Sequence, residues 1–203
     1  VYTHGHVDHV FGTAVFEAEV AEAGGRPVEV IAHEEVDPRF DRYCETAGYN
    51  AVINARQFGD RLGRRDQAAV TFFDDWVRPD RTYRLEDTVT YGDHAFALHH
   101  GKGETDDHTW TWVPEHRAVV AGDFFIWVFP NAGNPQKAQR YPREWAEALR
   151  AMAATEPELF LPAHGLPIGG RDRIQRLLLG VADTLDQLVA AVLARMNAGE
   201  PLD

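Results

Sequence analysis

Seven residues at the start of the sequence constrain its fold and chemistry more than any other segment. They read Thr3-His4-Gly5-His6-Val7-Asp8-His9, so three imidazoles and one carboxylate fall within six consecutive residues. Neutral imidazole and carboxylate are the side chains that bind first-row divalent metals. A regular strand would place His9 on the opposite face from the other three. A loop after a strand end can divide them between two neighbouring metals. The alternative is a solvated, histidine-rich loop.

Three later segments place further metal-competent side chains where strands are expected to end. They are Glu104 after Gly103, Asp123 after Gly122, and His164 before Gly165. Loops at strand ends are where a scaffold displays functional groups. Each of these residues alone could belong to an ordinary turn or helix cap, but their order after the first motif favours a metal site. His99 and His100 lie close enough in sequence to Glu104 to be alternative ligands.

The composition narrows the class of protein. With 203 residues, 44% of them hydrophobic, the chain is long enough for one domain with a substantial core. A formal net charge of −12 makes nucleic acid a poor partner. Cys44 is the single cysteine, so no internal disulfide can form, and a soluble protein of either the cytoplasm or the periplasm fits. We expect no membrane span, because no apolar run approaches the required length.

Hydrophobic periodicity predicts helices and short strands that interleave along the chain. Helices are expected at 11–23, at 37–47 and 50–58 in part, from Pro142 onward, and at 171–197 before a stop at Gly199. Short strands are expected at 28–32, 69–73, 82–85, 88–91, 95–100, 109–113, 118–121 and 158–162. This pattern predicts an α/β (α+β) protein with helices layered on sheet.

The motif residues 3–9, Gly122-Asp123 and Pro162-Ala163-His164-Gly165 together resemble the metallo-β-lactamase-fold hydrolase superfamily. The resemblance implies an αββα sandwich with a C-terminal helical extension. It also implies that the sequence begins inside the first half of that fold, after its first strands. We therefore expect a metallo-β-lactamase-fold domain over 1–170 and a C-terminal helix over 171–203 that would begin a dimerisation region.

The resemblance assigns the metal ligands residue by residue. His4 and His6 correspond to ligands of the first metal; Asp8, His9 and His164 to ligands of the second; and Asp123 to the bridging carboxylate. The superfamily usually supplies a third imidazole to the first metal, where this sequence has Glu104. A carboxylate at that position is similar to the alkyl sulfatase branch. Residues 47–50 and the end of the last helix resemble the same branch, which implies a homodimer formed through the C-terminal helical region.

A formal charge count then guides the choice of substrate. The formal charges of two divalent cations, three carboxylates and a bridging hydroxide sum to zero. An anionic ester would therefore need a separate positively charged side chain to bind it. Arg56 is the first candidate for binding that ester, with Asn50 and Asn54 as further donors. Zinc is the expected metal, with manganese or iron as alternatives because of the added carboxylate.

The expected function is that of a metal-dependent hydrolase acting on a small-molecule ester. Two metals about 3.5–4 Å apart would hold a bridging hydroxide, oriented by Asp8, that attacks the substrate. Alkyl sulfate esters are the first candidate substrates. The alternatives are another ester, thioester or lactone hydrolase of the same fold, or a non-hydrolytic metal-binding or diiron redox module.

Overall fold

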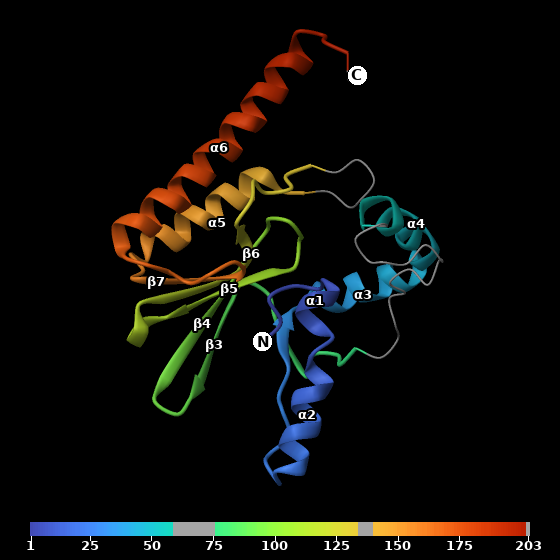
Figure 1. Ribbon diagram of the computed structural model, residues 1–203, viewed down its shortest axis with the longest axis vertical. Helices are drawn as coiled ribbons and strands as arrows, with labels where there is room; N and C mark the ends of the chain where they lie inside the picture. Colours follow the sequence, from blue (N-terminus) through green and yellow to red (C-terminus); the bar gives the residue numbers. More distant parts are fainter. Residues whose placement is uncertain (59–75, 134–139, 202–203) are drawn as a thin grey trace. The chain divides into compact units, whose positions relative to one another are not determined.

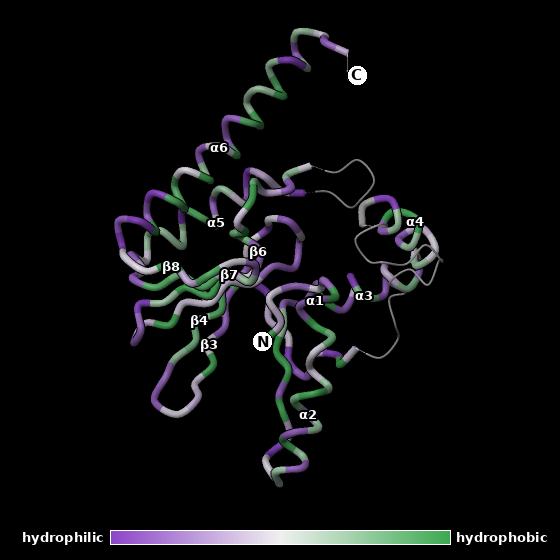
Figure 2. The backbone as a smooth tube through the Cα atoms, viewed as in Figure 1, coloured by the Kyte–Doolittle hydropathy of each residue, from purple (hydrophilic) through white to green (hydrophobic). Residues whose placement is uncertain are grey.

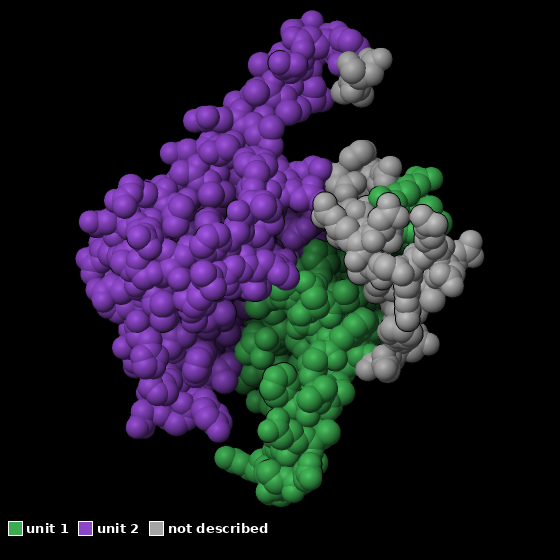
Figure 3. Space-filling view, in the orientation of Figure 1, with its two compact units in different colours: residues 1–84, 135–138 green, residues 85–134, 139–203 purple. Residues whose placement is uncertain are grey.

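The computed structural model describes residues 1–58, 76–133 and 140–201, which form two compact units (Figure 3). The first unit contains the described residues up to Arg84, and the second contains those from Leu85 onward. The strand expected at 69–73 and the last two residues of the expected C-terminal segment lie outside the described residues. The predicted boundary between 170 and 171 stays a prediction.

The first unit is built around a short buried strand. Its elements are α1 (Val7–Val10), α2 (Thr13–Glu22), β1 (Ile31–His33), α3 (Val36–Glu45), α4 (Ala47–Phe58) and β2 (Arg81–Tyr83) (Figure 1). β1 and β2 pair in parallel, and Tyr2 donates its backbone N–H to the Ile31 carbonyl at 2.9 Å. A core of Tyr2, Val10, Val30, Ala32, Val36 and Phe40 surrounds this strand. The histidine-rich segment therefore starts at a fixed point beside β1.

The second unit is a six-stranded sheet with two long helices. Its elements are β3 (Glu86–Tyr91), β4 (His94–Gly101), β5 (His108–Val113), η1 (Pro114–His116), β6 (Ala118–Ile126), α5 (Pro142–Ala154), β7 (Leu159–His164), β8 (Ile168–Gly169) and α6 (Arg171–Asn197). The strands follow one another in chain order, and every pair is antiparallel except β6 and β7. α5 lies in the connection between these two parallel strands, as a crossover helix does.

The core of the second unit lies where α5 and α6 pack against the sheet. Trp145, Leu149 and Met152 on α5 are buried together with Leu178 on α6 and Phe124 on β6. The indole Nε1 of Trp145 donates to the backbone oxygen of Phe124 at 2.8 Å, so the large aromatic side chain is also hydrogen-bonded. This contact ties the start of α5 to the strand that carries Asp123.

α6 is buried along only part of its length. Its buried residues are Ile174, Leu178, Ala182 and Leu185, and every residue from 190 to 200 is exposed. Figure 2 shows that hydrophobic and hydrophilic residues recur along this helix. An 18-residue window of this helix has a mean hydropathy of 1.7, so α6 is, by length and composition only, long and apolar enough to cross a membrane. The helix carries Asp183 and Asp186 near its middle, and the expectation of no membrane span stays a prediction.

Two elements differ from the sequence-based expectations. The run beginning at Ala118 was expected to stop at Gly122, but β6 continues to Ile126. Gly122 has a φ of 53°, and the pairing of β6 with β7 shifts register there, so a β-bulge stands where a turn was expected. Asp123 therefore lies on a strand. α1 begins inside the histidine-rich motif, which was expected to be a loop throughout.

Candidate functional site

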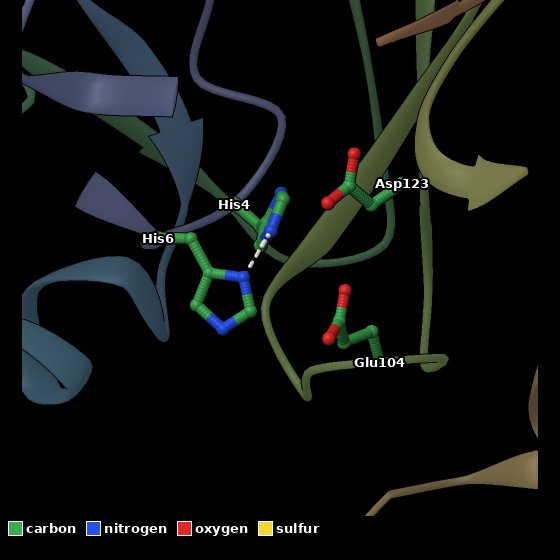
Figure 4. Close-up of side chains that lie close together, drawn as sticks. All are labelled: His4, His6, Glu104 and Asp123. Atoms are coloured by element: carbon green, nitrogen blue, oxygen red, sulfur yellow. Dashed lines mark hydrogen bonds between the residues drawn. The ribbon is translucent and has the colours of Figure 1, made fainter. Parts of the chain in front are cut away.

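The first candidate group is the set of imidazoles in the first unit. His4 is fully buried, and its Nε2 lies 2.8 Å from Nδ1 of His6 (Figure 4). Two nitrogens bound to one tetrahedral zinc at 2.0–2.1 Å would be about 3.4 Å apart. The two nitrogens therefore already point to nearly the same place.

The hydroxyl of Thr3 contacts two of the imidazoles in this motif. Its hydroxyl lies 3.1 Å from Nδ1 of His4 and 2.9 Å from Nδ1 of His9. A contact at Nδ1 leaves Nε2 as the atom directed toward a metal, which is how polar neighbours orient metal-binding histidines. Sequence reasoning included Thr3 in the motif but gave it no role. Its position next to His4 was the signal that could have identified it.

Asp8 and His9 both lie on α1, the single turn of helix inside the motif. The side chain of His9 is 7% exposed and that of Asp8 is 51% exposed. Their closest charged atoms, His9 Nε2 and Asp8 Oδ2, are 3.6 Å apart. The ring of His9 also lies against that of His4, with centroids 4.2 Å apart. Asp8 is thus the member of the motif best placed to contact a ligand from solution.

The second candidate group belongs to the second unit and centres on Asp123. The Asp123 side chain is 7% exposed, and its Oδ1 lies 3.5 Å from Nε2 of His164, the last residue of β7. The backbone N–H of Asp123 donates to Nε2 of His108 at 3.2 Å, and the His108 ring stacks on Phe124. His108 therefore holds the strand at Asp123. The sequence gave no indication of this contact.

Glu104 lies in the loop between β4 and β5 (Figure 4). A side chain at Gly103 would collide with Phe124, because a Cβ there would lie 2.9 Å from that ring. The absence of a side chain at Gly103 thus allows the loop to pack closely against β6. Glu104 itself is 16% exposed at its side chain and forms an ion pair with Arg140.

His99 and His100, the alternative ligands, take part in contacts within the sheet. His99 stacks on Trp110 with centroids 4.2 Å apart, and its Nδ1 lies 3.2 Å from a Glu86 carboxylate oxygen. His100 Nδ1 lies 3.0 Å from the backbone oxygen of His108. These contacts engage both rings with neighbouring strands and favour Glu104 as the metal-binding residue.

The three candidate substrate-binding residues lie on α4, but they do not share one face. Asn50 and Asn54 are one turn apart, and Asn50 donates through Nδ2 to the Thr46 hydroxyl at 2.8 Å. Arg56 follows Asn54 by two residues, which rotates it by about 200° around the helix. Arg56 is exposed. Asn50 and Asn54 therefore lie on a different face of α4 from Arg56, and the role of all three residues in substrate binding stays a prediction.

Comparisons with known proteins identify the family of this chain. The family model described as the metallo-beta-lactamase superfamily matches residues 1–164, so the chain belongs to the metallo-β-lactamase superfamily and has its α/β fold. Within curated proteins, the chain is 23% identical over 217 residues to a linear primary-alkylsulfatase from a Pseudomonas species. That match covers 98% of this chain and 40% of the relative, so the chain spans well under half of the relative's length.

Solved structures show the same fold. A double mutant of a sec-alkyl sulfatase superposes with a TM-score of 0.78 at 19% identity, covering 98% of this chain and 34% of that one. An inverting sec-alkylsulfatase from Pseudomonas sp. has a TM-score of 0.68 at 18% identity, with the same coverage. A metallo-β-lactamase from Pseudomonas aeruginosa, solved in its mono-zinc form, has a TM-score of 0.51 at 17% identity and covers 90% of this chain and 65% of that one.

Proposed function

We propose that the chain carries the metal centre of a dinuclear metal-dependent hydrolase. In this proposal His4, His6 and Glu104 bind the first metal; Asp8, His9 and His164 bind the second; and Asp123 bridges them. The observation that carries the proposal is the convergence of His4 Nε2 and His6 Nδ1 to 2.8 Å within the matched family segment. The close approach of Asp123 to His164 independently supports the second set.

The donor set fits divalent metals of intermediate hardness. Imidazoles favour zinc, and three carboxylates make manganese or iron reasonable alternatives. Such a pair, when bound, supplies a water with its pKa lowered toward about 7 and positive charge for the developing negative charge. The protein's part is to hold that geometry. Thr3 orients two imidazoles, His108 fixes the strand at Asp123, and the exposed carboxylate of Asp8 would orient a water held at the site.

Alkyl sulfate esters are the proposed substrates. The similarity to a linear primary-alkylsulfatase and the carboxylate at position 104 support this choice. A cluster of exposed apolar side chains also supports it, because an alkyl chain needs an apolar surface. This cluster consists of Trp127, Val128, Phe129 and Leu166. A Cβ at Gly165 would lie 1.6 Å from the Trp127 indole nitrogen, so this indole lies against the residue that follows His164.

Two alternative functions remain tied to the same donors. One is hydrolysis of another ester, a thioester or a lactone, and the other is a non-hydrolytic metal-binding or diiron redox role. The exposed indole of Trp127, which lies against Gly165 next to His164, favours a substrate with an apolar part, and thus favours hydrolysis over a redox role.

A substrate panel tests the proposal. Purified protein loaded with zinc, manganese or iron is assayed on alkyl sulfates of increasing chain length, beside a lactone and a thioester panel. We expect hydrolysis of the sulfates, abolished by H6A and by D8A, and a larger rise in KM for long chains than for short chains in W127A. Hydrolysis of lactones or thioesters alone would assign the first alternative, and oxygen uptake by iron-loaded protein would assign the second.

We also propose that the protein forms a homodimer through α6. Leu188, Val192 and Met196 recur every fourth residue and are 38%, 48% and 58% exposed. A contiguous apolar stripe of this kind on an exposed helix face is typical of an interface. A second copy of the same helix is the proposed occupant, and an ester substrate remains the proposed small-molecule partner.

A further inference from the structure

A nearly buried arginine holds the backbone and the side chain of Glu104 at the same time. Arg140 Nη1 lies 2.6 Å from Glu104 Oε1 and donates to the Glu104 backbone oxygen, also at 2.6 Å. The Arg140 side chain is only 6% exposed. A charge removed from water to this extent is costly unless it is paired, and the structure supplies that pair. Arg143, three residues further along the chain, is by contrast exposed.

The backbone next to Arg140 reinforces this contact. Tyr141 donates its N–H to the Gly103 carbonyl at 3.0 Å, and Gly103 donates to the Thr105 carbonyl at 3.0 Å. α5 begins immediately afterwards, at Pro142. The Glu104 loop is thus fastened at two successive residues, Gly103 and Glu104, to the segment that starts a helix of the core. Such fixation defines the position of a carboxylate more closely than a single surface ion pair would.

We propose that Arg140 is a positioning residue that orients Glu104 for the first metal and offsets its charge. This inference rests on the proposed function. A guanidinium and a carboxylate sum to zero, so the pair presents the metal with the same net charge as a neutral imidazole. The chain can therefore use a hard oxygen ligand at this position without lowering the positive charge available to an anionic ester. Polar partners behind a metal ligand typically contribute 10–100-fold to metal affinity.

Competitive zinc titration of the full chain tests this inference with four variants. R140Q removes the charge and the planar guanidinium group, and R140K keeps the charge. R143Q is the matched control, because it removes an exposed arginine from the same segment. E104Q removes the proposed ligand itself. We expect R140Q to bind one of its two metals 10–100-fold more weakly, R140K to lose less, and R143Q to match the wild type.

The cobalt-substituted protein gives a second readout that does not depend on activity. Its visible absorption should change in R140Q and in E104Q, and stay unchanged in R143Q. Wild-type zinc affinity and an unchanged cobalt spectrum in R140Q, with a metal lost in E104Q, would overturn the role of Arg140 and leave the proposed function intact. Wild-type metal binding in E104Q would instead reject the ligand set, and the inference with it. If R140Q fails to fold by near-ultraviolet circular dichroism, R140M decides, because it removes the charge and keeps an apolar stem: wild-type affinity in that variant overturns the inference.

Discussion

Thr3 is a single hydroxyl that contacts two of the histidines in the opening motif. Because it lies within 3.1 Å of both Nδ1 atoms, it can fix two ring orientations with one side chain. In the proposed site the motif is therefore more than a list of ligands, since Thr3 fixes how two of its histidines are directed. Sequence patterns reveal which residues are ligands more readily than which residues orient them, because orientation depends on contacts that no spacing rule encodes.

Replacing Thr3 by Val removes the hydroxyl and keeps the shape of the side chain. We expect T3V to weaken zinc binding by about 10–100-fold, because His4 and His9 lose the partner at Nδ1. Isothermal titration or competition with a chelating dye measures the change. T3S keeps the hydroxyl and should stay within a few-fold of the wild type. Equal affinities in T3V and T3S would remove Thr3 from the site.

Gly103 permits the close packing of the Glu104 loop. A Cβ there would lie 2.9 Å from Phe124 and 3.2 Å from Trp145, both buried rings. We expect G103A to lower the free energy of unfolding by about 1–3 kcal/mol, because those rings cannot move aside without strain. Chemical denaturation provides the measurement. G169A is the control, since a Cβ there meets nothing within 4 Å, and a loss of stability equal to that of G103A would contradict the explanation.

Secondary-structure elements differ in how well the sequence predicts them, and the reasons are physical. α6 was predicted to the residue, 171–197, because a long apolar stripe and Gly199 mark its course and its end. The four residues of α1 are too few for any periodicity to be visible. β6 was predicted too short because Gly-Asp is typical of a turn, whereas its pairing with β7 extends the strand.

The residues of the candidate site also differ in how well the sequence predicts them. The ligand types came from local motifs and from their order along the chain. The roles of Arg140 and His108 could not be predicted, because neither stands in a recognisable motif. Arg140 is 36 residues from its partner Glu104, and His108 is 15 residues from its partner Asp123. Long-range contacts of this kind depend on how β6 and α5 are placed in the sheet, which periodicity alone does not determine.

α6 allows the proposed dimer to be tested at the scale of one element. V192E places a charge in the middle of the exposed stripe, so we expect dimer dissociation to become at least about tenfold easier. Sedimentation velocity over a range of concentrations gives the association constant. Q187E adds the same charge at another exposed position of the helix and should leave association unchanged. A monomeric wild type at all concentrations would reject the dimer.

Metal removal tests the proposal at the scale of the whole molecule. A ligand that binds only the folded state stabilises it by about 4 kcal/mol at a thousandfold excess over its dissociation constant. We therefore expect a chelator to lower Tm by several degrees and zinc to restore it, while H6A shows little response to either. Differential scanning fluorimetry follows the shift, and elemental analysis gives the metal content. Fewer than one metal per reconstituted chain would rule out a dinuclear centre.

The bulge in β6 has a consequence for how the fold can tolerate change. Between Val120 and Ile126 this strand advances six residues while β7 advances three, from Leu161 to His164. The bulge accommodates the extra residues of β6. The alternation of inward-facing and outward-facing side chains therefore restarts after Gly122 instead of continuing from Ala118. The core-facing positions therefore change phase along one strand, since Val119 and Ala121 belong to the core before the bulge and Phe124 belongs to it after the bulge. A change that removed the bulge would turn one of these two groups away from the core.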